Sequence, residues 1–144
     1  MDVSELHPLS GTAILIVEDD DRAAADMSNL VRGAGGTVFR LARDGAAALQ
    51  ILSGSLPDGV LLNVGLVAGS GLHVARRLRE LDLPFVVVSV FNRQDMASAE
   101  LSNAPYFTTP YRREDVVRAL VGVLEARRAT KAAASPLHPL RDRS

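Results

Sequence analysis

The sequence predicts one α/β domain in which five parallel strands alternate with five helices. Two runs, Thr12–Val17 and Phe85–Val90, are almost wholly apolar and β-branched, as in strands that are buried on both faces. Apolar residues at helical spacing lie between the strand-like runs, a pattern typical of a doubly wound sheet with right-handed crossovers. The 144 residues, of which 47% are hydrophobic and 23% charged, suffice for one packed core.

The first half of the chain supplies a lead, two strands and two helices. Residues 1–10 are expected to be a flexible lead, and Thr12–Val17 is the first strand. Asp20 or Asp21 caps the first helix, which Gly35-Gly36 stops. Its inward residues follow steps of four, three and four: Ala23, Met27, Leu30 and Ala34.

The second strand, Thr37–Ala42, is short and more polar, so we expect it near a sheet edge. Asp44 caps the helix that follows, and Gly54 closes it. The third strand, Asp58–Leu62, is an apolar run that ends in the polar residue Asn63 and then a glycine-rich loop.

The second half begins with a helix from about Gly71 to Leu81 and the strand Phe85–Val90. The segment Asn92–Asn103 has a thin apolar stripe and is predicted as a short helix. Pro105–Thr108 is the fifth strand, and a cis peptide is possible at Thr109-Pro110. The last helix has Glu114 or Asp115 in its first turn and runs to about Arg128. The domain is expected over 11–129, with a C-terminal tail over 130–144.

The carboxyl ends of parallel strands meet at one edge of the sheet, where open α/β proteins build their sites. We therefore expect five polar residues around a single crevice: Glu18, Asp19, Asn63, Ser89 and Thr109.

Composition excludes several classes of function. The chain has no cysteine, which rules out disulfides, thiolate catalysis and cysteine-held metals. Neither a signal peptide nor a membrane-length apolar run is present, so a cytoplasmic location and no membrane partner are expected. A formal net charge of −1 gives no reason to expect nucleic-acid binding.

The chain from Gly11 to Arg128 resembles the receiver domain of bacterial two-component response regulators. The resemblance rests on motifs in a specific order: ILIVED after a short lead, PDGVLLN before a loop and a helix opened by Gly71, VVVSV ending near a hydroxyl residue, and the aromatic pattern from Tyr106 to Tyr111. It implies the flavodoxin-like (CheY-like) sheet with strand order 2-1-3-4-5 and a role in phosphorelay signal transduction rather than enzymatic turnover.

Receivers of this family accept a phosphoryl group from a histidine kinase on an aspartate, with Mg²⁺ on a carboxylate pair. The resemblance puts Asn63 at the aspartate position and Thr109 at the position of the phosphate-binding lysine. It identifies Glu18 and Asp19 with the metal carboxylates, and it assigns the switch positions to Ser89 and Tyr106. The loop also departs from the family, with Val67 where proline is usual.

These departures predict a pseudo-receiver. An amide oxygen is neutral and its lone pair is delocalised, so Asn63 should not form an acyl phosphate. Thr109 lacks the cation that would stabilise phosphoryl transfer. Because one negative and one positive charge are lost together, the pair favours a natural degenerate receiver over a laboratory Asp-to-Asn change.

No cofactor is expected apart from Mg²⁺, bound weakly or not at all. Glu18, Asp19 and the carbonyl oxygen of Asn63 form a vestigial metal set with one anionic ligand fewer than the family has.

The predicted function is a stand-alone receiver-like protein that acts by contact with a histidine kinase or another response regulator. The expected output face consists of the fourth helix, the fifth strand and the fifth helix, near Tyr106, Tyr111 and Arg112, and homodimerisation through it is one mode of contact. Two alternatives remain: phosphorylation at Asp20, Asp21 or Ser89, and a small-molecule-binding flavodoxin-like module.

The segment after Ala126 carries five basic residues and one acidic residue, a net charge of 5 − 1 = +4. It is either a solvated helix end with a disordered tail or a docking element for an acidic partner.

Overall fold

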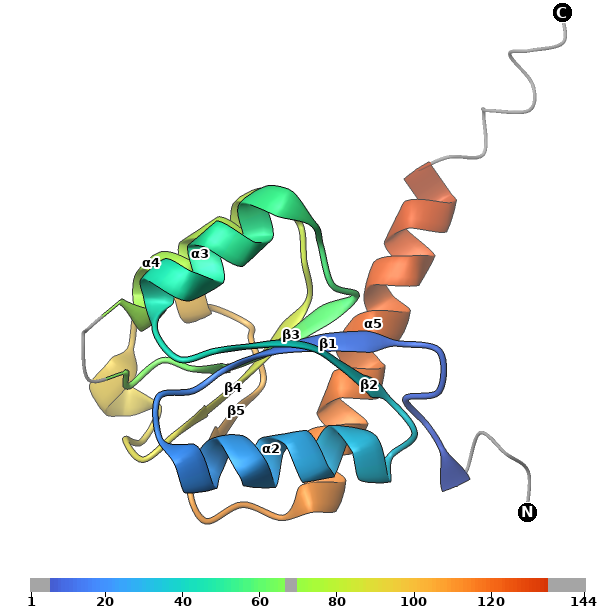
Figure 1. The fold of residues 1–144 in the computed structure, drawn as a ribbon. Coiled ribbons are helices and arrows are strands. Elements are labelled where there is room, and N and C mark those ends of the chain that lie inside the picture. Colours follow the sequence, from blue (N-terminus) through green and yellow to red (C-terminus); the bar gives the residue numbers. More distant parts are fainter. Residues whose placement is uncertain (1–5, 67–69, 135–144) are drawn as a thin grey trace, which may run out of the picture.

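The computed structural model describes residues 6–66 and 70–134. Five parallel strands form one sheet in the order β2-β1-β3-β4-β5, which confirms the predicted fold class (Figure 1). The strands are β1 (Ala13–Val17), β2 (Thr37–Ala42), β3 (Gly59–Asn63), β4 (Phe85–Ser89) and β5 (Tyr106–Thr108). β2 lies at an edge, as its polar composition predicts, and a register shift separates Ile14 from Leu15 where β1 pairs with it.

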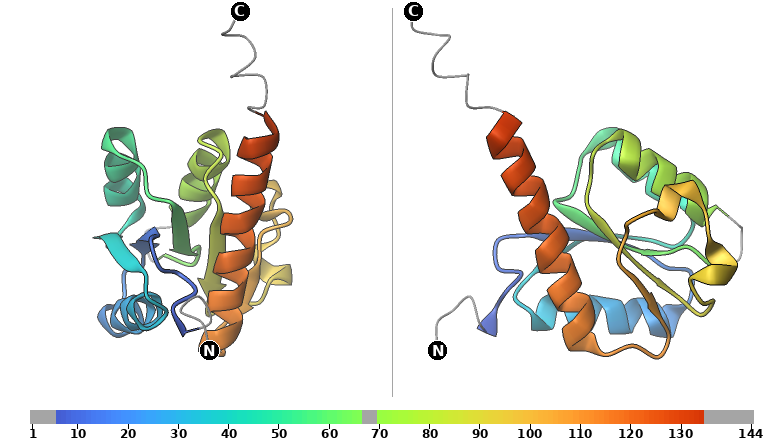
Figure 2. Two further views of the ribbon diagram at one scale, coloured as in Figure 1. Left: turned by 90° about the vertical axis from the view of Figure 1, so that its right-hand side faces the viewer. Right: turned by 180° about the vertical axis from the view of Figure 1, so that it is seen from behind.

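Within residues 6–66 and 70–134, four α-helices cover the two faces of the sheet (Figures 1 and 2). They are α2 (Asp21–Gly33), α3 (Gly45–Gly54), α4 (Gly71–Glu80) and α5 (Arg113–Ala134). The first two start where predicted, because the Asp20 side chain accepts from the Ala23 amide at 2.8 Å and the Asp44 side chain accepts from the Ala47 amide at 2.7 Å.

Alternate residues of each central strand enter two separate core layers. Leu15 and Val17 of β1 pack with residues of α3 and α4, whereas Ile14 and Ile16 pack with residues of α2 and α5. The inward face of α2 is slightly rotated from the prediction, with Ala24 buried rather than Ala23. Because both faces are covered, the polar strand ends are left to form the site.

The predicted helix over Asn92–Asn103 is wrong. Two single-turn 3₁₀ helices, η1 (Gln94–Met96) and η2 (Ala99–Leu101), stand there instead, so the described chain has four α-helices rather than the five predicted. The Ser98 hydroxyl accepts from the Glu100 amide at 3.2 Å, and Ser98 itself is extended. Such local bonds compete with a continuous helix, and Leu101 is the only buried residue in either turn.

Two details near the ends of the described chain differ from the prediction, whereas the division into a lead, a domain over 11–129 and a tail stays a prediction. Leu9, placed in the flexible lead, is completely buried, and its amide donates to the Ala34 carbonyl at 2.8 Å. At the other end, α5 runs six residues past the predicted Arg128, since Ala-rich sequence continues the helix to Ala134. Residues 1–5 and 135–144 lie outside the described residues.

Candidate functional site

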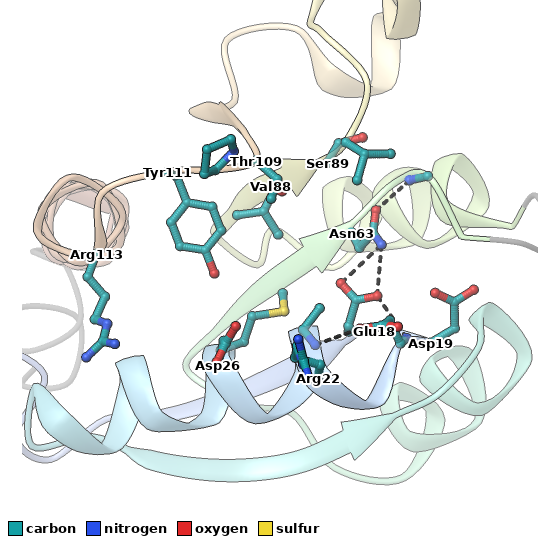
Figure 3. Close-up of a pocket in the computed structure, with 16 residues that line it drawn as sticks. Glu18, Asp19, Arg22, Asp26, Asn63, Val88, Ser89, Thr109, Tyr111 and Arg113 are labelled. Atoms are coloured by element: carbon teal, nitrogen blue, oxygen red, sulfur yellow. Dashed lines mark hydrogen bonds between the residues drawn. The ribbon is translucent and has the colours of Figure 1, made fainter.

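A cleft of about 630 Å³ opens at the carboxyl ends of β1, β3, β4 and β5 (Figure 3). The five polar residues predicted to gather around one crevice all line it: Glu18, Asp19, Asn63, Ser89 and Thr109. Parallel strands bring these residues together although they are spread over 92 positions of the sequence, from 18 to 109.

Glu18 is a buried carboxylate, with only 4% of its surface exposed. Its Oε2 atom accepts from the Asp20 amide at 3.1 Å. Burial raises the pKa of Glu18 above its usual value, and the neighbouring Asp19 contributes to the rise. The hydrogen bonds from the Asp20 backbone and the Asn63 side chain act in the opposite direction without cancelling the effect of burial.

Asn63, the last residue of β3, is tied at both ends of its amide. Its Nδ2 atom donates to the two carboxylate oxygens of Glu18, at 3.1 Å and 3.0 Å (Figure 3). Its Oδ1 atom accepts from the Gly65 amide at 2.8 Å. The partners fix this orientation, because a carboxylate only accepts and a backbone N–H only donates.

These residues do not fit the family's Mg²⁺ site. The sequence predicts that the Asn63 carbonyl oxygen could serve as a ligand, but that oxygen faces the Gly65 amide, and the Nδ2 group points to Glu18. Rotating the amide toward a cation would set its NH₂ group against the Gly65 N–H. Among residues 6–66 and 70–134, no three His, Cys, Asp or Glu side chains are placed to hold a metal. The strength of Mg²⁺ binding stays a prediction.

Thr109 lies at the exposed rim of the cleft, and its amide donates to the Ser89 carbonyl at 2.8 Å. The peptide bond that follows, Thr109-Pro110, is cis. Among the described residues that line the cleft, the positive charges are Arg22 and Arg113, which come from α2 and α5 (Figure 3). Thr109 itself is uncharged and adds no positive charge to the cleft that it shares with Asn63.

Phe91, which was not among the predicted site residues, links the two predicted switch residues. Its amide donates to the Ser89 hydroxyl at 3.0 Å, and its carbonyl accepts from the Tyr106 hydroxyl at 2.7 Å. A Cβ atom on Gly65 would lie 3.0 Å from the Phe91 ring, so the ring rests on the loop after Asn63. An aromatic residue two positions past the strand-end serine was the available signal.

Arg93 also contacts Tyr106. Its guanidinium lies 5.8 Å from the centre of the Tyr106 ring, and one of its nitrogens donates to the Ala104 carbonyl at 2.8 Å. Ser89 is 2% exposed and Tyr106 is half-buried. The two switch positions are thus joined through Phe91 in one hydrogen-bonded arrangement.

Tyr111, which was predicted to lie near the output face, lines the cleft (Figure 3). Burial raises the pKa of its phenol, and the Asp26 and Glu18 carboxylates raise it further. Arg112 is exposed, and its carbonyl accepts from the Asp115 amide at the start of α5. Of the three residues assigned to the output face, Tyr111 therefore turns inward to the site.

The alternative phosphoacceptors are already engaged. Asp20 caps α2, and Asp21 forms an ion pair with Arg43. The Ser89 hydroxyl is buried and bonded to the Phe91 amide. Val67, where the family usually has proline, lies outside the described residues.

Within the described part of the chain, no helix has the length and apolar character needed to cross a membrane.

Comparisons with solved structures agree with the fold. PhyR from Brucella abortus superposes with a TM-score of 0.77 at 24% identity, over 94% of this chain and 57% of that one. A response regulator receiver protein from Sinorhizobium medicae gives a TM-score of 0.73 at 28% identity, covering 81% and 96% of the two chains.

The sequence comparisons identify the family. The response regulator MprA of Mycolicibacterium vanbaalenii is 30% identical over 114 residues, which are 76% of this chain and 49% of the relative. MprA of Mycobacterium tuberculosis is 28% identical over 125 residues, 84% of this chain and 54% of the relative. The chain thus spans about half the length of the curated relatives it matches. The model of the response regulator receiver domain matches residues 14–120, and the chain therefore belongs to that family.

Proposed function

We propose that this chain is a pseudo-receiver of a two-component system, which is not phosphorylated at Asn63 and acts by contact with a histidine kinase or another response regulator. The observation that carries the proposal is the state of the Asn63 amide, whose two ends are bonded to Glu18 and Gly65. The proposed setting is the bacterial cytoplasm, on the ground of the family alone.

The chemistry at position 63 supports this proposal. Attack on a phosphoryl group needs an ionised oxygen, and the Asn63 oxygen is a neutral amide oxygen that already accepts from the Gly65 amide. Thr109 brings no charge to stabilise the transferred group. Restoring the aspartate at position 63 alone therefore leaves the cation missing, and restoring the lysine at position 109 alone leaves the nucleophile missing.

The proposed contact surface is the outer face of η1, η2, β5 and α5, with homodimerisation through this face as one mode. Tyr106 joins this surface to the cleft, because its hydroxyl donates to the Phe91 carbonyl. The fourth helix of the predicted output face was the segment Asn92–Asn103, where η1 and η2 stand instead. The helix labelled α4 is a different element, which packs beside η2.

Incubation with acetyl phosphate tests the first half of the proposal. We expect intact-mass spectrometry to find no phosphoryl adduct on the wild type or on Asn63→Ala, and a hydroxylamine-labile adduct at position 63 in the Asn63→Asp/Thr109→Lys variant. Asn63→Asp alone should be labelled less, because the cation is still absent. A stable adduct on the wild type, whether at Asp20, Asp21, Ser89 or elsewhere, would overturn the pseudo-receiver.

Affinity capture tests the second half. The wild type and the Asn63→Asp/Thr109→Lys variant should retain the same histidine kinase or response regulator, identified by mass spectrometry and then verified with the purified partner. If the double variant alone binds that partner, recognition depends on phosphoryl chemistry and contact alone does not account for the function.

A further inference from the structure

The buried carboxylate of Glu18 needs a positive counterpart, and the chain itself provides one. A carboxylate at 4% exposure has lost nearly all of its water, which is costly unless hydrogen bonds replace it. One bond comes from the Asp20 amide at 3.1 Å. A second donor is Asn63, whose Nδ2 group lies 3.1 Å and 3.0 Å from the two oxygens of Glu18 (Figure 3). The Asp19 side chain also forms a hydrogen bond with Glu18.

This NH₂ group is held in place by the opposite end of the same side chain. The Asn63 oxygen accepts from the Gly65 amide at 2.8 Å, so the amide cannot turn over without setting donor against donor. The positive end of the amide dipole is thereby fixed against the carboxylate. The Phe91 ring packs against Gly65 in turn, so that a Cβ atom built on Gly65 would lie only 3.0 Å from the ring.

An aspartate at position 63 would reverse this arrangement. A third carboxylate would stand about 3 Å from Glu18, with Asp19 beside both. Like charges at that separation disfavour the simultaneous ionisation of the three carboxyl groups. The family meets the same difficulty with a divalent cation. In this chain the neutral NH₂ group of Asn63 lies against Glu18, where the divalent cation would otherwise be needed.

We propose that Asn63 replaces the divalent cation of the family as an internal counter-group to Glu18, so that the folded crevice neither needs nor selects a metal ion. The inference goes beyond the proposed function, because it concerns what holds the crevice together and holds even if another residue is phosphorylated. It also predicts that one substitution at position 63 creates metal dependence.

Thermal unfolding of the full chain in EDTA, Mg²⁺ or Mn²⁺ tests the inference. The melting temperature of the wild type should be the same in all three. Asn63→Asp should melt lower than the wild type in EDTA and rise with the logarithm of Mg²⁺ concentration; at ten times its Kd, a bound ion multiplies the folding equilibrium constant by about 11. Asn63→Ala should melt lower and gain nothing from metal.

Asn29→Asp, on the exposed surface of α2, is the matched control for an added charge and should respond to Mg²⁺ like the wild type. Broadening of the amide signals around position 63 by Mn²⁺ should occur in Asn63→Asp and not in the wild type. If Asn63→Asp is unfolded in EDTA, recovery of its circular dichroism on adding Mg²⁺ is the equivalent result.

Three outcomes would overturn the inference: a wild type stabilised by Mg²⁺ as much as Asn63→Asp, an Asn63→Asp variant as stable as the wild type in EDTA, or one that Mg²⁺ does not rescue. None of these measurements detects phosphorylation. Failure here therefore leaves the proposed pseudo-receiver to be judged by its own mass spectra.

Discussion

At the scale of single residues, the site depends on how Asn63 and Glu18 match each other. Asn63 differs from aspartate by one NH₂ group in place of an oxygen, yet this group changes the residue from a potential nucleophile to a donor for a buried carboxylate. The charged form of Glu18 is still disfavoured, because burial raises the pKa of this carboxyl group despite these hydrogen bonds. Its ionisation should therefore weaken the fold.

The pH dependence of Glu18→Gln tests this expectation. Since the pKa of Glu18 is raised on folding, its stabilising contribution is complete below the ordinary value of 4.5 and is lost as the pH rises through the raised value. The free energy of unfolding of the variant, relative to that of the wild type, should thus be greater at pH 8 than at pH 4.5. Denaturant unfolding at both pH values measures it, and a pH-independent difference would contradict the assigned cause.

At the scale of elements, the start of α4 is fixed by a close approach of two backbones. A Cβ atom on Gly71 would lie 2.4 Å from the Val64 carbonyl oxygen and 2.6 Å from its Cα atom. Both groups are backbone and cannot move aside like a flexible side chain. The loop from Asn63 to α4 therefore requires glycine at this position, which explains why Gly71 opens the helix.

Two glycine substitutions should have opposite effects. Gly71→Ala should lower the free energy of unfolding by about 2 kcal/mol or more, because the added methyl group overlaps the backbone of Val64. Gly122→Ala, inside α5 with open space around its Cβ position, should raise it by roughly 0.5–1 kcal/mol. Urea denaturation of both variants tests the pair, and equal effects would rule out the close approach as the cause.

At the scale of the whole molecule, the cleft is connected to the edge strand β5 through Phe91. The ring rests on Gly65 beside the Asn63 amide, and the backbone binds both Ser89 and Tyr106. Coupling between the cleft and the outer face therefore has a physical route that needs no phosphoryl group. Phe91 as a whole is 47% exposed, and this exposed surface is open to a partner.

Removing the Phe91 ring should loosen this route. Phe91→Ala should cost about 1–2 kcal/mol, less than a fully buried phenylalanine, and should speed amide hydrogen exchange at Gly65 while shifting the Tyr106 ring signals. Val90→Ala removes a side chain that is 69% exposed and serves as the control. Equal changes at Gly65 and Tyr106 in both variants would show that the Phe91 ring does not couple the two sites.

The sequence by itself determined the sheet, its order through the family resemblance, the two aspartate caps and the residues gathered at the cleft. Each of these follows from local patterns: apolar runs, helical spacing, capping chemistry, and the rule that parallel strands end at one edge. The same logic failed for Asn92–Asn103, where side-chain bonds to the backbone within the segment replaced a helix by two 3₁₀ turns.

Only the tertiary structure decided the direction of the Asn63 amide, the inward position of Tyr111 and the role of Phe91. The Asn63 amide depends on Glu18, 45 residues away, and Phe91 depends on Tyr106 and Gly65, 15 and 26 residues away, at distances that no local pattern specifies. The sequence could predict that a neutral residue stands at position 63. Packing of β3 beside β1 decided that this residue donates to the buried Glu18 carboxylate rather than offering its oxygen to a metal.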